Sequence, residues 1–191
     1  GASRVITVEH PHLKNYTSDG YSQAILAVVE QESPEAIVFG HTSLGKDLSP
    51  KIASRLQSGL VSDVTDIEGS GDDTVFIRPI YSGKAFEKVK IKDGVIFATI
   101  RPNNIAPLEK DGSRTGEVSS VSVDITNLRT IIKEVVRKST EGVDLSEAKV
   151  VVAGGRGVKS EEGFEPLKEL ANLLGGAVGA SRGACDAEYC D

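Results

Sequence analysis

The feature that most constrains the fold of this chain is an apolar run followed by glycine and then by helical periodicity. Residues 36–39 (Ala-Ile-Val-Phe) have the length of a buried strand, and Gly40 follows them. Leu48, Ile52 and Leu56 then recur at the spacing of an amphipathic helix. Because alternating strands and helices are typical of βαβ units, the pattern predicts a parallel sheet with right-handed crossovers.

The residues on either side extend this pattern. Residues 4–8 are predicted to form a strand, and residues 21–29 a helix whose N-cap candidates are residues 17–19. Further along, three short strands are expected over 75–80, 86–91 and 95–100. The Asp93-Gly94 dipeptide between the last two is typical of a hairpin turn. An antiparallel patch is therefore expected beside the parallel sheet, with another strand over 118–123.

A linker and a second domain are expected after this region. Asp124 or Asn127 is a candidate cap for a helix with one apolar face, formed by Leu128, Ile131, Ile132, Val135 and Val136. Polar residues around Gly142 follow. The predicted organisation is a first α/β domain over 1–126, a helical linker over 127–147, and a second domain over 148–191.

The second domain repeats the strand–glycine–helix order. Residues 149–153 predict a buried strand that ends at Gly154-Gly155-Arg156-Gly157, and Ser160 is a candidate helix cap. The helix stripe consists of Phe164, Leu167, Leu170 and Leu174. Residues 177–180 predict the next strand, which leads into Ser181-Arg182. This order is typical of the start of a doubly wound, Rossmann-like domain, here expected to be truncated.

Composition excludes several classes of function. The net charge of −6 argues against nucleic acid as the main partner, because phosphate binding needs clustered Lys and Arg. No apolar run approaches the roughly 18 residues of a membrane span. The three histidines do not assemble into a catalytic arrangement with Ser, Cys or Asp, so no hydrolase site and no catalytic residue are predicted.

The chain has no Met and begins with Gly1, so we expect a processed chain or a fragment.

Metal binding is not expected. His10 and His12 flank Pro11 without acidic or Cys neighbours, which favours a surface turn. Cys185 and Cys190 lack the further ligands that a zinc site needs, and we expect them to be reduced thiols in an intracellular protein.

The chemistry is expected at the carboxyl ends of parallel strands, where open sheets bind ligands. Gly155 and Gly157 allow close backbone approach, Arg156 supplies a cation, and the following helix N-terminus favours anions. Ser181 and Arg182 end the next strand, so both arginines could meet one anionic ligand. Neither common phosphate-loop spacing fits, and a glycine-rich turn with two solvated cations remains the alternative.

Residues 40–46 (Gly-His-Thr-Ser-Leu-Gly-Lys) form the corresponding loop of the first domain. Tight packing and anion binding explain its glycines equally well. The alternative function is therefore a nucleotide-binding α/β enzyme that uses these glycine-rich loops.

Several segments resemble the alpha subunits of electron transfer flavoproteins. Residues 151–160 (Val-Val-Ala-Gly-Gly-Arg-Gly-Val-Lys-Ser) are similar to the segment that opens the FAD-binding domain of that family. The similarity continues at residues 178–182 and Asp186, and upstream at residues 45–50, 62–63 and 81–85. Arg101-Pro102-Asn103-Asn104 resembles the bacterial branch more than the mitochondrial one.

The resemblance implies an electron carrier, not an enzyme. It implies FAD, a heterodimer with a beta subunit that carries AMP, electron donation by acyl-CoA dehydrogenases and electron acceptance by a membrane-bound quinone oxidoreductase. It implies no membrane insertion and a bacterial cytoplasmic location, with the mitochondrial matrix as the alternative. By resemblance, Arg156 and Ser181 correspond to FAD-contacting positions, and Arg182 to an arginine packed over the flavin ring. Other FAD-contacting loops of the family, among them a Gln-x-Gly-Gln-Thr-Gly loop, have no counterpart here, so we expect an internal piece of the subunit.

Overall fold

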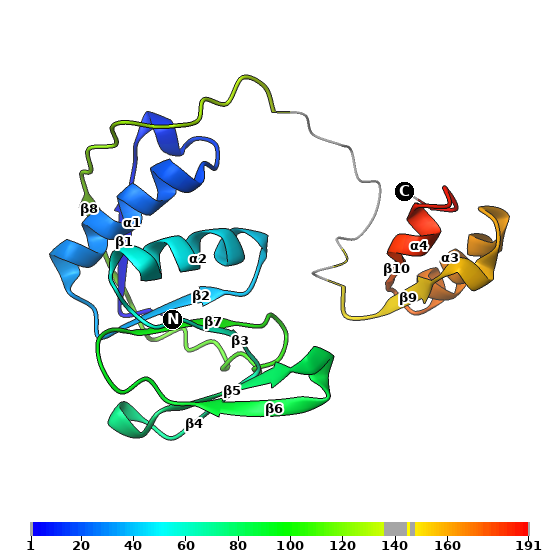
Figure 1. Ribbon diagram of the computed structural model, residues 1–191, viewed down its shortest axis with the longest axis horizontal. Coiled ribbons are helices and arrows are strands. Elements are labelled where there is room, and N and C mark those ends of the chain that lie inside the picture. The colour runs from blue at the N-terminus through cyan, green and yellow to red at the C-terminus, as the bar shows by residue number, and fades with distance from the viewer. Residues whose placement is uncertain (1, 136–144, 146–147, 191) are drawn as a thin grey trace. The chain divides into compact units, whose positions relative to one another are not determined.

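The computed structural model describes residues 2–135, 145 and 148–190. The chain divides into two compact units, Gly1–Lys133 and Glu134–Asp191 (Figure 1). Parallel strands occur in both units, and the first unit also contains an antiparallel sheet. The mixed α/β class expected from the sequence is therefore confirmed.

The N-terminal half of the first unit follows the predicted order of strand, helix, strand and helix. The elements are β1 (Arg4–Val8), α1 (Ser18–Glu32), β2 (Ala36–Gly40) and α2 (Ser43–Arg55). A threonine immediately precedes each of these two helices, and its hydroxyl accepts a backbone N–H of the first turn. Thr17 accepts from Gly20 and Thr42 accepts from Gly45. These N-caps satisfy donors that the helix itself cannot pair.

A three-stranded parallel sheet lies at the centre of the first unit, in the order β2-β7-β3. β7 (Ile96–Ile100) lies between β2 and β3 (Val61–Val64). A second parallel pair joins β1 to β8 (Glu117–Val121). The strand expected over 118–123 is therefore present as β8.

The antiparallel sheet has the order β4-β5-β6. It consists of β4 (Asp66–Glu68), β5 (Val75–Ile80) and β6 (Ala85–Val89). The predicted pairing across Asp93-Gly94 is wrong, because residues 96–100 enter the parallel sheet as β7 and do not pair with β6. Phe97, Ala98 and Thr99 are all buried. A strand with both faces covered belongs in the middle of a layered structure and not in a half-exposed hairpin.

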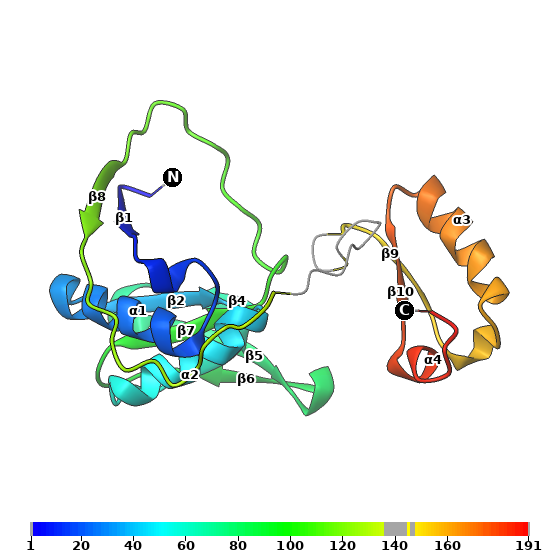
Figure 2. The same cartoon turned by 90° about the horizontal axis from the view of Figure 1, so that it is seen from above.

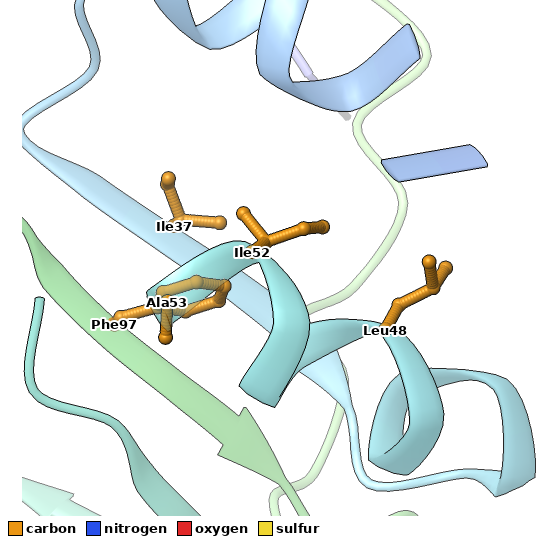
Figure 3. Packing of buried hydrophobic residues seen from close by; sticks show 5 residues of the cluster. All are labelled: Ile37, Leu48, Ile52, Ala53 and Phe97. Carbon is orange, nitrogen blue, oxygen red and sulfur yellow. The ribbon is translucent and has the colours of Figure 1, made fainter. Parts of the chain in front are cut away.

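Both faces of the parallel sheet are packed. On one face, α2 inserts Leu48, Ile52 and Ala53 against Ile37 of β2 and Phe97 of β7 (Figure 3). On the other face, Ala98 packs with Phe76 of the antiparallel sheet and with Val61 and Val64 of β3. Figure 1 shows the resulting three layers of helices, parallel sheet and antiparallel sheet, which overlap when they are seen from above in Figure 2. Burial of each large side chain in these layers contributes about 1.5–3 kcal/mol.

The helix expected from Asp124 or Asn127 onward is absent over residues 122–135, which form neither helix nor strand. The backbone N–H groups of Thr126 and Arg129 instead donate to the side chains of Gln23 and Asp19 on α1. Ile131 is 87% exposed, so the apolar stripe that suggested a helix has no layer to pack against among the described residues. Val136 and most of residues 137–147 lie outside the described part of the chain.

The second unit contains two parallel strands, β9 (Val151–Gly154) and β10 (Ala177–Ala180), with α3 (Glu165–Leu173) between them in sequence. Two 3-10 turns, η4 (Arg156–Val158) and η5 (Glu162–Phe164), precede α3, and the short α4 (Arg182–Cys185) follows β10. Ser160 does not cap α3: its hydroxyl accepts the Gly163 N–H of η5, and α3 begins later than predicted, at Glu165. Phe164 and Leu167 pack on β9, but Leu170 and Leu174 are exposed, contrary to the predicted stripe.

Candidate functional site

The carboxyl ends of β9 and β10 lie side by side. The strands pair in parallel register, with Gly154 opposite Ala180, and the Ser181 N–H donates to the Gly154 carbonyl at 2.9 Å. The two segments that follow these strands, Gly155-Arg156-Gly157 and Ser181-Arg182, therefore lie at the same edge of the sheet. The structure brings together the two segments that the sequence singled out.

Arg156 lies across the start of α4. Its Nε donates to the Gly183 carbonyl over a long 3.4 Å. A Cβ placed on Gly183 would lie 2.9 Å from the same Nε, so the absence of a side chain at residue 183 makes room for the arginine. The Arg156 side chain is exposed, and one weak hydrogen bond leaves most of its donors available to a ligand.

Arg182 projects into solvent. Its side chain is 93% exposed, and its Nε is 3.7 Å from an Asp186 carboxylate oxygen. An exposed ion pair four residues apart contributes little stability, so this contact does not fix the guanidinium strongly. Arg182 can therefore turn toward a group bound above the strand ends.

The glycines beside these arginines differ in what surrounds them. A Cβ on Gly155 would meet only the Ser181 hydroxyl, at 3.5 Å, and a Cβ on Gly157 would meet nothing within 4 Å. Among the described residues, no packing contact requires glycine at either position. Both backbones are open to the approach of a ligand, and the cofactor-binding role of these two positions stays a prediction.

The helix N-terminus expected beside Arg156 is not there. One turn of 3-10 helix follows Arg156, and α3 starts nine residues later. The intervening segment carries Glu161 and Glu162, and Glu165 opens α3. A hydrogen bond from its own backbone N–H, and then one from the Ser160 hydroxyl, lower the pKa of the Glu162 carboxyl. The helix start is therefore occupied by negative charge, and anion binding at this edge depends on the arginines.

A second polar cluster lies at the carboxyl ends of the central sheet of the first unit. Arg101 follows β7 and donates to both carboxylate oxygens of Asp63, at 2.8 and 2.6 Å. His41 follows β2; its Nδ1 is 2.9 Å from the Thr99 hydroxyl and its Nε2 is 3.7 Å from Asp63. The Thr99 hydroxyl also accepts the Asp63 N–H at 3.0 Å.

The sequence analysis did not identify this cluster. Its members are far apart along the chain, and only the β2-β7-β3 pairing brings them together. The hydrogen bonds from Arg101 are the main cause that lowers the pKa of Asp63, and partial burial opposes them. The signal that could have found the cluster is the position of each residue at or near the end of an apolar run.

The loop over residues 40–46 is packed, not open. A Cβ on Gly45 would lie 1.8 Å from the Gly40 carbonyl oxygen, so α2 touches the end of β2 at this point. Of the two readings of this loop, the structure favours tight packing for Gly45. The loop therefore gives no support to a nucleotide-binding enzyme built on it.

The remaining candidates behave as surface features. The His12 N–H donates to Nδ1 of His10 in a short 3-10 turn (η1, Pro11–Leu13). In the part of the chain that the structure describes, no three His, Cys, Asp or Glu residues gather as metal ligands. Cys185 and Cys190 are both free thiols. None of the described helices is long and apolar enough to cross a membrane.

Comparison with known proteins connects these sites to one family. The model of the electron transfer flavoprotein domain matches residues 1–126, and the model of the electron transfer flavoprotein FAD-binding domain matches residues 144–191. The alpha subunit of the electron transfer flavoprotein of Bacillus subtilis is 64% identical over 191 residues, which cover 100% of this chain and 59% of that protein.

Two further bacterial alpha subunits are similar over nearly the whole chain. That of Thermoanaerobacterium thermosaccharolyticum is 38% identical over 193 residues, which cover 99% of this chain and 58% of the relative. That of Clostridium acetobutylicum is 37% identical over 198 residues, which cover 100% of this chain and 59% of the relative. The chain thus spans less than two thirds of the length of these relatives. It belongs to the electron transfer flavoprotein family and is similar to the alpha subunits of that family.

Proposed function

We propose that this chain is part of the alpha subunit of an electron carrier and that its second unit contributes to an FAD site. The observation that carries the proposal is the edge formed by β9 and β10, where two arginines and two unobstructed glycines converge within the match to the FAD-binding domain model. FAD supplies the redox chemistry when it is bound, and the protein supplies position and electrostatics.

The residues at this edge have distinct proposed roles. Gly155 and Gly157 admit the cofactor close to the backbone, since no side chain fills the space. Arg156 and the Ser181 hydroxyl provide donors for phosphate oxygens. Arg182, which is exposed and loosely paired, stacks its guanidinium on a planar ring and places a fixed positive charge there. The parallel order β9-α3-β10 supports the start of a doubly wound, Rossmann-like domain.

The first unit is proposed to contact a beta subunit that carries AMP. Its antiparallel sheet exposes large apolar side chains, with Ile67 40% and Phe86 64% exposed, as expected of a surface that a partner covers. The donors are proposed to be acyl-CoA dehydrogenases and the acceptor a quinone oxidoreductase, in the bacterial cytoplasm. This assignment rests on the family alone.

The role of Arg156 is tested by flavin retention. In the complete alpha subunit with its partner, Arg156→Ala should raise the dissociation constant for FAD by one to two decades, because a charge-assisted contact contributes about 1.5–3 kcal/mol. Lys149→Ala is the matched control, since it removes an exposed cation near the opposite end of β9. Flavin fluorescence during dilution measures the constant. Equal constants for Arg156→Ala and the wild type would remove Arg156 from the site.

The role of Arg182 is tested by potentiometry. A fixed cation against the ring favours added negative charge, so Arg182→Ala should lower the potential of the first electron. Arg182→Lys should restore only part of the loss, because it keeps the charge but stacks poorly. Spectroelectrochemical titration of the heterodimer gives both values. An unchanged potential in Arg182→Ala would show that this arginine does not tune the cofactor.

A further inference from the structure

The first unit contains a hollow of about 400 Å³ beside the Asp63–Arg101 pair. Its lining includes those two residues, Arg78 of β5 and the turn Tyr81–Gly83 that joins β5 to β6. The hollow lies next to the carboxyl ends of β3 and β7. This is the edge at which parallel sheets bind ligands.

Arg78 lines this hollow and carries one unpaired donor beneath the surface. Its Nε is buried and has no hydrogen-bond partner among the described residues. A terminal nitrogen lies 3.6 Å from the Glu87 carboxylate, which is too long for a hydrogen bond. Because this Nε is closed off from solvent, only the terminal nitrogens of the Arg78 side chain, which is 31% exposed, can reach a ligand in the hollow.

Asp63 holds Arg101 in place but does not engage all of its N–H donors. The two hydrogen bonds to the carboxylate engage Nε and one terminal nitrogen. The other terminal nitrogen takes part in none of the hydrogen bonds found in the described residues. The hollow is thus lined by two guanidinium groups and the Asp63 carboxylate, and the Glu87 carboxylate lies 3.6 Å from the Arg78 guanidinium.

The turn over residues 81–83 adds further polar groups. Tyr81, Ser82 and Gly83 all have positive φ, at 51°, 57° and 85°. Two successive non-glycine residues in this region are uncommon and persist only where the surroundings hold them. The Ser82 hydroxyl and the backbone of this turn belong to a third segment around the hollow, apart from Arg78 and Arg101.

We propose that this hollow binds a phosphate group through Arg78, Arg101 and the turn Tyr81–Gly83. A carboxylate is satisfied by one guanidinium, as Asp63 is by Arg101. Donors from three segments instead suit an anion whose oxygens point in several directions, which is the geometry of phosphate. The site does not depend on the proposed FAD site, because it lies in the first unit.

The test is a titration of the ¹⁵N-labelled 191-residue chain with inorganic phosphate at neutral pH and constant ionic strength. Phosphate should cause saturable shifts at the amides of residues 81–83. Arg78→Gln should weaken binding at least tenfold, whereas Arg114→Gln, which removes an exposed arginine on a distant stretch of sequence, should leave it unchanged. If Arg78→Gln does not fold, Arg78→Lys is measured in its place and should weaken binding at least threefold.

Three results would overturn the proposal. The first is the absence of saturable shifts at residues 81–83. The second is phosphate affinity that survives both substitutions of Arg78. The third is acetate binding at the same amides with equal or higher affinity, which would assign the hollow to a carboxylate such as an acidic side chain of a partner.

Discussion

The backbone of Asp63 has a φ of 63°, a left-handed conformation that Asp and Asn adopt more readily than most residues. This geometry sends its N–H to Thr99 and its carboxylate to Arg101. One side chain therefore links the ends of β3 and β7. Asparagine keeps the backbone preference and removes the charge, so it isolates the electrostatic contribution.

Asp63→Asn should lower the free energy of unfolding at neutral pH by about 1 kcal/mol, since the pair is partly exposed and screened. The folded-state pKa of Asp63 is held below its unfolded value of about 3.9. Its stabilisation is therefore present above about pH 4 and is lost as the pH falls through the folded-state pKa.

Urea denaturation at pH 7 and pH 3 measures this difference. The gap between wild type and Asp63→Asn should narrow at the lower pH. Asp72→Asn changes an exposed aspartate of a short turn and should behave like the wild type at both values. A gap of the same size at pH 3 and pH 7 would show that the charge of Asp63 does not stabilise the fold.

At the scale of elements, the contact of η5 and α3 with β9 is made through a glycine. A Cβ on Gly154 would lie 2.6 Å from a ring carbon of Phe164 and 2.7 Å from a methyl of Leu167. The strand end can approach the helical segment this closely only because residue 154 has no side chain. Gly157, three residues later, has no such neighbour.

Gly154→Ala should destabilise the second unit by about 1–3 kcal/mol, because the added methyl overpacks a closed contact. Gly157→Ala adds the same methyl in open space and should change stability by less than about 0.5 kcal/mol. Thermal or urea unfolding followed by circular dichroism compares the two variants. Equal free energies of unfolding for Gly154→Ala and Gly157→Ala would mean that β9 and α3 can move apart with little loss of stability.

At the scale of the whole molecule, the two units supply different parts of the proposed carrier. The first has a three-layer core with both sheet faces covered, whereas the described sheet of the second has two strands. Among the described residues of the second unit, the proposed FAD contacts lie at the ends of β9 and β10. A partial set of contacts cannot offset the loss of translational freedom and the ordering that binding requires.

The 191-residue chain by itself should therefore not retain FAD through purification. Its absorbance spectrum should lack the flavin bands, while the complete subunit with its partner should show them. Stoichiometric flavin bound to this chain alone would contradict the prediction. That result would also require contacts beyond Arg156, Ser181 and Arg182.

The sequence by itself determined the elements whose hydrophobic pattern and end signals agree. β2, α2, β9 and β10 follow apolar runs, glycines and helical periodicity, and Thr17 caps α1 within the predicted segment. These are local effects, because caps, turns and amphipathic faces depend on residues within a few positions of each other. For the same reason, the sequence alone identified residues 155–157 and 181–182, the two segments of the proposed FAD site.

Only the tertiary structure decided which elements pair and which apolar stripes are covered. Residues 96–100 have the pattern of a hairpin strand but fill the centre of a parallel sheet, and residues 128–135 have a helical stripe but form no helix. The cluster of His41, Asp63 and Arg101 likewise exists only because β2, β7 and β3 lie side by side. Pairing depends on burial over the whole unit, and neighbouring residues along the chain carry too little of that information to fix it.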